Sequence, residues 1–438
     1  MTNFETHIQA NRDARTMRRI VMASVLGNAL EWYDFFLYGT AAALIFAPLF
    51  FPAGTDPVLG TMASFAGFAV GFLARPLGGV IFGHIGDKSG RKKALILTLG
   101  IMGAATFAIG LLPTFEQAGY LAPVCLVLLR ILQGVASGGE WGGGVLLISG
   151  NAPKGRLGFF AAWSQLGVVG GFVLSAAAFY LIQLLPVEQM MSWGWRLPFL
   201  ASIVIFGVGV YIRRHLPESK EYEAQNGSNE KQNEHVPVLE LFRNHRKALL
   251  QAMGLRIAEN GSAYLFLAFT VAYAKFTGLD TQLVLASVMV AMIVEAFSLV
   301  FWGWLSDRIG RRLVYAFGSV SLMLFAFPFF WLLDTHQPAL VYLATLVGLA
   351  VCHGAMIGTQ PALMGELFPA KVRYSGLAMG HEIASIVSGG LAPLAATALF
   401  SIYKDAWPVS VMLVVMGAIT TVAVISIRQP RGEAPTVQ

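Results

Sequence analysis

Two stretches of this chain repeat each other: Gly83-His84-Ile85-Gly86-Asp87-Lys88-Ser89-Gly90-Arg91-Lys92-Lys93 and Gly303-Trp304-Leu305-Ser306-Asp307-Arg308-Ile309-Gly310-Arg311-Arg312-Leu313. Two glycines, an aspartate and an arginine hold the same spacing in both copies. The copies begin at 83 and 303, which is 220 residues apart, and half of the 438-residue chain is 219. The chain therefore consists of two similar halves, each with a basic loop at the same place.

The composition is that of a membrane protein. Hydrophobic residues make up 56% of the chain and charged residues only 12%, whereas about 25% of residues in soluble domains are charged. The net charge of +6 does not indicate nucleic-acid binding, because the bases lie in short clusters between apolar runs, as the positive-inside rule requires. The two cysteines, Cys125 and Cys352, lie far apart in apolar segments, which excludes a disulfide framework.

Twelve segments are long and apolar enough to cross a lipid bilayer, which takes about 20 residues. They are 20–47, 60–83, 94–112, 122–149, 158–183, 196–214, 246–275, 282–305, 313–333, 339–367, 374–402 and 407–428. Most Lys and Arg residues fall in the tails and in every second loop, so an even number of spans with both termini in the cytoplasm is expected.

The predicted fold is an all-α membrane protein of two six-helix halves, which matches the major facilitator fold. Its parts are a cytoplasmic N-tail (1–19), a first six-helix bundle (20–214), a cytoplasmic linker (215–245), a second six-helix bundle (246–428) and a cytoplasmic C-tail (429–438). The polar stretch from Glu218 to Glu234 predicts a mobile surface linker.

The repeated loop contains more than a turn with basic residues. A tight turn explains the glycines, and the preference of cytoplasmic loops for Lys and Arg explains the bases. Neither explains an aspartate at the same place in both copies. A carboxylate there can pair with a base or lie at a helix N-terminus. Following spans two and eight, the loop resembles the signature of the major facilitator superfamily. The resemblance implies that Asp87 and Asp307, with Arg91 and Arg311, latch the cytoplasmic ends of the halves when the carrier faces outward.

Other strings narrow the resemblance to the metabolite:proton symporter family, whose members carry α-ketoglutarate, proline and betaine, citrate or shikimate. They are Glu31-Trp32-Tyr33-Asp34-Phe35, Arg75-Pro76-Leu77-Gly78-Gly79, Gly138-Gly139-Glu140-Trp141-Gly142-Gly143 and Trp193-Gly194-Trp195-Arg196. Within that family, Glu140–Gly143, Leu255–Glu259 and Arg373–Gly376 are most similar to the shikimate permeases. The resemblance implies a multi-pass protein of the bacterial inner membrane that works as a monomer.

Charged side chains inside a bilayer cost several kcal/mol and usually serve function. At a rise of about 1.5 Å per residue, Asp34 and Arg130 lie at similar depth and can pair. Arg75 and Glu140 form a second candidate pair, which can act as a gate latch. Each pair also has a simpler interpretation as a structural ion pair between helices, and Glu295 has no obvious partner in the sequence.

We expect Asp34 to be the main proton carrier, with Arg130 as its partner and Glu31 as a further candidate. A carboxylate beside an arginine stays ionised. If the substrate carboxylate competes for the arginine, the acid loses its partner and takes up a proton, which couples proton binding to substrate binding.

The candidate substrate site combines cationic, aromatic and hydrogen-bonding residues. Arg130 and Arg256 favour an anion, and Glu259 shares a helix face with Arg256. Histidine and glutamine can hydrogen-bond a hydroxylated substrate, although a buried histidine often only bonds a neighbouring helix, and aromatic residues often only pack. These further candidates are His353, Gln360, His381, Tyr33, Tyr38, Trp141, Gln165 and Tyr264.

The sequence therefore predicts a proton-coupled symporter for a small organic anion, with shikimate or a similar cyclic acid as the preferred substrate. A keto or dicarboxylic acid, or a zwitterion such as proline or betaine, remains an alternative, as does a non-transporting membrane sensor. An enzyme is not expected, since His381-Glu382-x-x-Ser385 fails the HExxH pattern and no GxSxG or GxxxxGK[ST] occurs. No metal or cofactor is expected besides the proton gradient.

The halves are not identical in their charges. Asp34, Arg75, Arg130 and Glu140 have no matching copies 220 residues later. Proton coupling is therefore expected mainly in the first half, and substrate selection at its boundary with the second.

Overall fold

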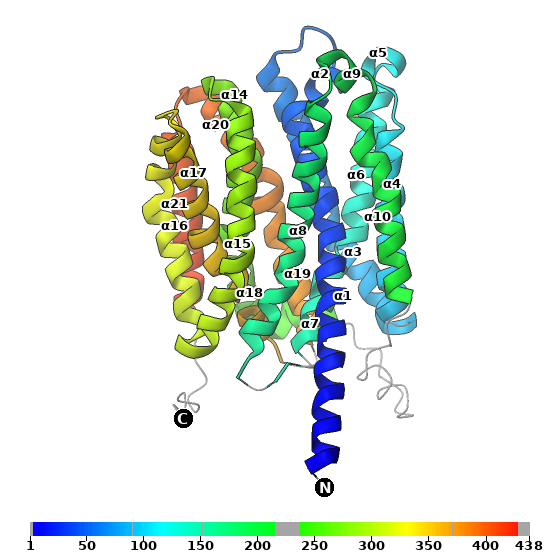
Figure 1. Cartoon of the computed structure of the whole chain (residues 1–438), viewed down its shortest axis with the longest axis vertical. Coiled ribbons are helices and arrows are strands. Elements are labelled where there is room, and N and C mark those ends of the chain that lie inside the picture. Colours follow the sequence, from blue (N-terminus) through cyan, green and yellow to red (C-terminus); the bar gives the residue numbers. More distant parts are fainter. Residues whose placement is uncertain are drawn as a thin grey trace.

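The chain folds into two helical bundles that stand side by side (Figure 1). The computed structural model describes residues 3–89, 91–149, 152–153, 155–214, 237–369 and 372–427. All regular elements within these ranges are helices, which confirms the predicted all-α class. α1 begins and α21 ends on the same side of the molecule, which we call the N end of the bundle.

The first bundle holds the elements up to residue 214. They are α1 (Asn3–Leu44), α2 (Phe46–Phe50), α3 (Pro57–Ser89), α4 (Arg91–Gly110), α5 (Phe115–Ala118), α6 (Leu121–Ser137), α7 (Glu140–Ser149), α8 (Leu157–Gln183), α9 (Val187–Gln189), η1 (Met190–Gly194) and α10 (Arg196–Arg214).

The second bundle follows the same plan. Its elements are α12 (Pro237–Asn244), α13 (Arg246–Tyr264), η2 (Leu265–Phe269), α14 (Thr270–Thr277), α15 (Thr281–Ile309), α16 (Arg311–Leu333), α17 (Pro338–Leu346), η3 (Val347–His353), α18 (Gly354–Gly365), α19 (Arg373–Ser385), η5 (Ile386–Leu391), α20 (Ala392–Tyr403) and α21 (Trp407–Ser426). The π-helical segments η2, η3 and η5 adjoin buried polar residues, where such irregular turns often mark functional sites.

Nine helical stretches among the described residues are long and apolar enough to cross a membrane, and a pair bent by 46° around Trp195 raises the number to ten. The two remaining predicted spans contain α1 and α13, the first long helix of each half, and both carry buried charges. Large apolar side chains such as Phe297 (76% exposed) and Leu324 (75% exposed) lie on the outer surface, where lipid rather than water suits them.

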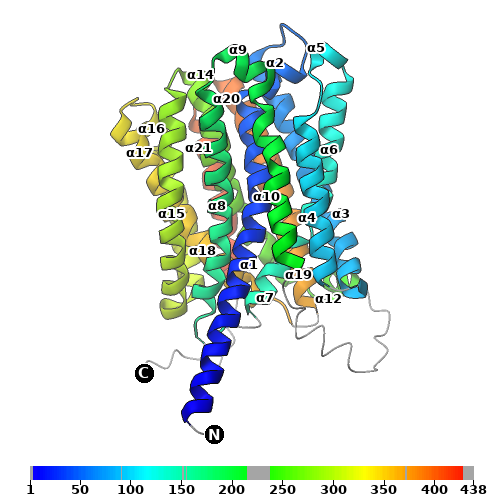
Figure 2. The same cartoon turned by 45° about the vertical axis from the view of Figure 1, so that its right-hand side comes forward.

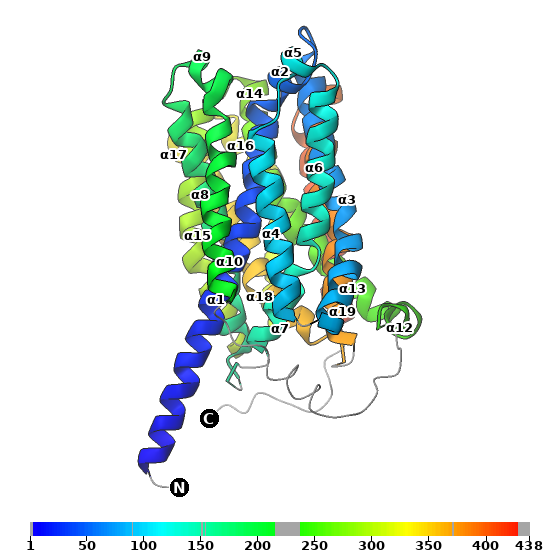
Figure 3. The same ribbon diagram turned by 90° about the vertical axis from the view of Figure 1, so that its right-hand side faces the viewer.

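Two predicted boundaries differ from the structure. α1 begins at Asn3, so the helix continues through the predicted N-tail instead of starting near residue 20. Within the predicted linker, residues 237–244 form α12, which contacts α13 and α19 at the N end (Figure 3). Leu241 of this short helix is fully buried, which explains how the helix docks. Residues 215–236 and 428–438 lie outside the described ranges.

The two bundles meet along a seam between α8 and α15, and between α3 and the α19–η5 segment (Figures 1 and 2). Within the first bundle, α3 and α6 approach closely because glycines line their contact. A Cβ atom at Gly134 would collide with the backbone carbonyl of Gly71, and one at Gly138 with that of Arg75. Gly134 and Gly138 therefore allow the two helices to pack closely.

Candidate functional site

The predicted pair of Asp34 and Arg130 is present and fully buried. Arg130 Nη1 lies 3.4 Å from Asp34 Oδ2. Asp34 Oδ1 also accepts hydrogen bonds from Thr106 Oγ1 at 2.5 Å and from Gln133 Nε2 at 2.6 Å. These donors come from α4 and α6, so the carboxylate of α1 is held by three side chains from two neighbouring helices. These three donors offset part of the cost of burying the ionised carboxylate, which is 0% exposed.

Arg130 keeps unused hydrogen-bonding capacity. Its Nε and Nη2 atoms have no hydrogen-bond partner among the described residues. Its guanidinium instead lies over the rings of Tyr38 and Phe35, at 4.1 and 4.8 Å from the ring centres. Aromatic faces stabilise the cation there without fixing its N–H groups. Arg130 can therefore change partners at lower cost than a fully bonded arginine.

The predicted pairing of Arg75 with Glu140 is wrong. Arg75 instead forms ion pairs with Glu31 at 3.4 Å and with Glu382 at 3.3 Å. Glu382 lies on α19, so this pair crosses the seam in the buried centre. The prediction compared only how deep each residue lies in the membrane. Depth does not tell which helix of the other half faces Arg75.

Phe35 connects the two first-half arginines. The Arg75 guanidinium lies 4.0 Å from the centre of the Phe35 ring, which also contacts Arg130. Phe35 directly follows Asp34 on α1, so a shift of α1 affects both arginines at once.

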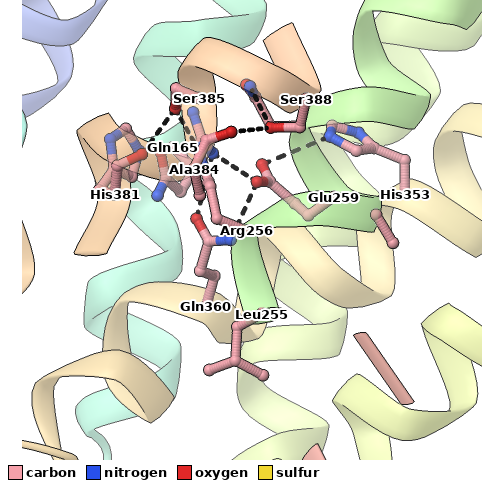
Figure 4. Close-up of polar contacts among 12 residues, drawn as sticks. Gln165, Leu255, Arg256, Glu259, His353, Gln360, His381, Ala384, Ser385 and Ser388 are labelled. Carbon is pink, nitrogen blue, oxygen red and sulfur yellow. Dashed lines mark hydrogen bonds and ion pairs between the residues drawn. The ribbon is translucent and has the colours of Figure 1, made fainter. Parts of the chain in front are cut away.

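A second polar cluster lies in the second half, where Figure 4 shows residues from α13, α18 and α19 converging. Arg256 forms an ion pair with Glu259 and donates to Ser385 Oγ at 3.2 Å. Gln360 donates from Nε2 to Glu259 Oε2 at 2.9 Å and to the Tyr315 hydroxyl at 3.0 Å. The predicted Arg256–Glu259 face is therefore part of a network rather than a self-neutralising pair.

Glu295 has a partner that the sequence did not reveal. Its Oε1 lies 2.5 Å from Nδ1 of His353, whose Nε2 lies 3.6 Å from Glu259 Oε1. The histidine of η3 therefore sits between carboxylates of α15 and α13.

A narrow central cavity lies at the seam and takes residues from both halves. Its lining combines aromatic residues of α1 and α7 with the polar cluster of α13, α15 and η3. The lining residues are Trp32, Phe36, Trp141, Gln165, Val168, Val169, Arg256, Glu259, Asn260, Ala263, Leu267, Met292, Glu295, His353 and Ile357.

Several buried polar atoms of this lining lack a hydrogen-bond partner within the part of the chain that the structure describes. The donors are Arg256 Nη2 and Trp32 Nε1, and the acceptors include Asn260 Oδ1 and Glu295 Oε2. Unpaired polar atoms in such positions are costly unless a ligand or water satisfies them. The cavity therefore offers a cation, an indole N–H and acceptors to a small polar molecule with an apolar or ring-shaped body.

The structure divides the predicted substrate residues into two groups. Trp141, Gln165, Arg256, Glu259 and His353 line the cavity. The others are buried outside its lining and have packing or network contacts.

Of this second group, Tyr33 donates to the carbonyl of Pro198 at 2.7 Å, which ties α1 to α10. Tyr38 stacks on Phe68, and Tyr264 packs against Trp32 and Phe72. His381 stacks on Trp141 across the seam with ring centres 4.0 Å apart. Gln360 lies outside the lining and donates a hydrogen bond to Glu259.

Asp307 joins the two halves at the N end. It accepts hydrogen bonds from the backbone N–H groups of Gly158 at 2.8 Å and Phe159 at 2.9 Å, which form the N-terminus of α8. Arg311 pairs with Asp307 at 3.0 Å and also with Glu366. This is the helix-terminus arrangement predicted for the repeated loop. The side chains of Asp87 and Arg91, in the first copy, lie outside the described part of the structure.

A second contact closes the opposite end. Lys275 of α14 donates from Nζ to the carbonyl oxygens of Ala43 at 3.0 Å and Leu44 at 3.5 Å, at the C-terminus of α1. A cation suits a helix C-terminus as an anion suits an N-terminus. At each end of the seam, a charged side chain of the second half therefore binds the backbone at a helix terminus of the first half.

The polar residues of these clusters that the sequence reasoning missed include Gln133, Asn260 and Thr106. Gln133 follows Arg130 by three residues on one helix face, and this spacing could have identified it. Asn260 follows Arg256 by four residues, so the same argument could have identified it. Thr106 carries no sequence signal, because a lone threonine in an apolar helix usually bonds its own backbone.

The described residues include no group of three or more His, Cys, Asp or Glu side chains placed to hold a metal ion. The clusters above consist of acid–base pairs and amide groups, whose chemistry is the binding of ions and protons rather than bond cleavage.

Comparisons with known proteins agree with this architecture. The family model described as Major Facilitator Superfamily matches residues 25–393. The shikimate transporter of Escherichia coli K12 is 40% identical, covering 89% of each chain. The inner membrane metabolite transport protein YhjE of that organism is 35% identical over 98% of each chain, and its proline/betaine transporter is 34% identical over 94% of this chain and 84% of the relative.

Among solved structures, the proton:xylose symporter XylE bound to 6-bromo-6-deoxy-D-glucose has a TM-score of 0.72 at 14% identity, covering 94% of this chain and 95% of that one. The partially occluded inward-open conformation of XylE from E. coli has a TM-score of 0.74 at 14% identity, covering 96% of this chain and all of that one. At this identity the similarity concerns the fold alone.

Proposed function

Because this chain belongs to the major facilitator superfamily, and is thus a multi-pass membrane transporter and not an enzyme, we propose that it is a proton-coupled symporter that imports a small organic acid. The preferred substrate is shikimate or a similar cyclic hydroxy acid. The observation that carries this proposal is the unpartnered Nη2 of Arg256, buried in a central cavity that also presents Trp32, Trp141 and hydroxyl-binding groups.

The substrate class follows from the chemistry of the cavity. A carboxylate satisfies Arg256, a hydroxyl group suits Asn260 Oδ1, and a ring fits against the aromatic residues of α1 and α7. The 40% identity to a shikimate transporter supports the same class. A zwitterion is the second candidate, since Glu259 beside Arg256 offers a site for an ammonium group and proline/betaine transporters are also relatives.

Proton coupling is assigned to Asp34. When Asp34 is ionised, it binds Arg130, Gln133 and Thr106 and holds α1 against α4 and α6. A proton on the carboxylate removes the charge that attracts Arg130, which can then turn to other partners. α1 also carries Trp32 and Phe36 into the cavity, so substrate and proton act on the same helix and their binding is linked.

The topology of the proposal follows the charge pattern of the sequence. We assign twelve spans, six in each half, with both termini and the N end of the bundle in the cytoplasm of a bacterial inner membrane. The Asp307 contact then closes the cytoplasmic side, and the Lys275 contact closes the outer side. The boundaries at 214 and 246 separate the halves that rock against each other, and we assign a monomer as the working unit.

The test is uptake of radiolabelled shikimate into proteoliposomes with an imposed pH gradient, acid outside. We expect the wild type to accumulate substrate above the external concentration. Asp34→Asn should lose accumulation but keep exchange of internal for external substrate. Asp56→Asn, an exposed acid whose side chain accepts from the backbone N–H groups of Val58 and Leu59 at the start of α3, is the control and should keep both activities.

The outcomes separate the alternatives. A sensor would bind substrate without accumulating it, and proton-driven accumulation by Asp34→Asn would contradict the assignment of that residue. Arg256→Gln should weaken binding of a carboxylate about 10- to 100-fold, since hydrogen bonds to charged groups contribute about 1.5–3 kcal/mol. Unchanged affinity in that variant would show that Arg256 does not bind the substrate carboxylate.

A further inference from the structure

The second half contains a buried acid–base pair for which the proposed mechanism has no use. Glu295 on α15 and His353 on η3 are each at most 2% exposed and lie 2.5 Å apart between Oε1 and Nδ1. A buried ionisable group inside a membrane helix is costly and rarely without function. Here two of them come from different elements and meet directly.

The pair is open to the central cavity. Both residues belong to the cavity lining, and Glu295 Oε2 and His353 Nε2 form no hydrogen bond with any residue in the described ranges. A proton can therefore enter or leave at Glu295 Oε2 without displacing another contact, and a proton on His353 Nε2 would face Glu259 Oε1, which lies 3.6 Å away. Asp34, by contrast, does not line this cavity, and its Oδ1 atom already accepts two hydrogen bonds.

The charges around the pair balance only when it holds a proton. α13 contributes Arg256 and Glu259, and α15 contributes Glu295. α16 contributes the neutral Tyr315 through Gln360 of α18, and α17 contains no charged residue. With His353 neutral the cluster carries one net negative charge, and with a proton on the pair it carries none.

Substrate binding makes that proton more favourable. A monoanion at Arg256 adds a negative charge, so the cluster would carry two without the proton and one with it. Confining two like charges in a buried site costs more than confining one. By linkage, a substrate anion therefore draws a proton onto the Glu295–His353 pair.

We propose that Glu295 and His353 form a second proton-binding site, so that each substrate monoanion crosses the membrane with two protons and one net positive charge. The proton adds to the free nitrogen of His353 or to the Glu295 carboxylate from water on the outer side. It leaves to water on the inner side, and no other bond changes. This inference rests on the proposed proton-coupled function.

The experiment measures accumulation of labelled shikimate in proteoliposomes while the pH gradient and the membrane potential are set independently. For the wild type, an inside-negative potential of 100 mV should raise steady-state accumulation about 50-fold, because one elementary charge gains about 2.3 kcal/mol per 100 mV. The double variant Glu295→Gln/His353→Gln removes both titrating groups. It should keep accumulation driven by the pH gradient and lose the response to potential.

Ser287→Ala is the matched control, because Ser287 is buried on α15 and its hydroxyl bonds only the backbone of the same helix. This variant should respond to potential as the wild type does. Exchange of internal for external substrate shows that each variant is folded and binds.

The outcomes distinguish this inference from the proposed function. A wild type that follows the pH gradient but not the potential overturns the two-proton inference and leaves proton coupling intact. A wild type that follows neither overturns the proposed function itself. A double variant whose accumulation still follows the potential rejects the pair as a proton site. A double variant that loses exchange along with accumulation also rejects it and assigns the pair to substrate binding instead.

Discussion

The contact of Asp307 with α8 makes a quantitative prediction about the conformational equilibrium. Asp307→Asn keeps the shape of the side chain but removes its charge. The variant places a neutral amide where a 7% exposed carboxylate accepts two backbone N–H groups at 2.8 and 2.9 Å and pairs with Arg311. The amide oxygen can still accept one N–H, whereas the amide nitrogen faces the other donor.

The expected size of the effect follows from the groups lost. A charge at a helix N-terminus contributes about 0.3–2 kcal/mol, and a hydrogen bond to a charged group about 1.5–3 kcal/mol. Part of this free energy is offset, because the same groups bind water when the N end is open. A net loss of about 2 kcal/mol shifts the ratio of closed to open N ends about 30-fold toward the open form.

The measurement is the distance distribution between spin labels at the N ends of the two halves. Met22 on α1 and Leu313 on α16 are exposed and suit as label sites, in a background where the two native cysteines are replaced by alanine. Asp307→Asn should add a population at longer distance. Asp334→Asn is the control, because Asp334 binds Tyr273 within the second half. An unchanged distribution, or an equal shift in the control, would refute the reasoning.

Three further variants test other parts of the seam and the site. Gly158→Ala should also open the N end, because its Cβ would lie 2.9 Å from the Asp307 carboxylate, and the same spin labels report it. Lys275→Gln should act in the opposite sense and favour opening of the other end, by about 0.5–1 kcal/mol for a partly exposed charge at a helix C-terminus; faster modification of a cysteine introduced beside it checks this. Tyr315→Phe removes two buried hydrogen bonds, from Gln360 Nε2 to the Tyr315 hydroxyl and from that hydroxyl to the Leu255 carbonyl; at about 0.5–1.5 kcal/mol each it should destabilise the protein by about 1–3 kcal/mol, measurable as a lower thermal unfolding temperature.

The general fold could be predicted because it depends on the repeat in the sequence and on the lipid bilayer as the solvent of the helices. The repeated loop fixed the half-length symmetry, and long apolar segments separated by basic loops have few alternatives to helices in a bilayer. The pairing of Asp34 with Arg130 was also accessible, because both lie in one half at one depth and few charges compete for them.

Contacts that cross between distant helices were not accessible. Arg75 binds Glu382, 307 positions away and in the other half, and no periodicity within α3 reports which helix of the second bundle it faces. The partner of Glu295 was missed for the same reason, since His353 sits on a π-helical turn that changes the direction of its side chain. Tyr33 and Tyr38 were predicted in the cavity as aromatic residues of a span, with packing as the alternative. In the structure α1 is surrounded by protein on several sides, and these rings face its neighbours.

The seam contacts at the two ends have an asymmetry with evolutionary consequences. Asp307 and Lys275 are side chains of the second half, whereas their partners on the first half are backbone groups of Gly158, Phe159, Ala43 and Leu44. Tyr374 repeats the pattern by donating to the carbonyl of Gly139 at 2.9 Å.

A backbone receptor persists through almost any substitution, so at these contacts mutation can remove the second-half partner far more readily than the first-half one. Random mutagenesis selected for altered gating should therefore recover changes in Asp307, Lys275 and Tyr374. In the first half it should recover mainly substitutions that add bulk, as at Gly158. The rate at which the carrier opens can thus be retuned one residue at a time, while the surface that receives the latches stays constant.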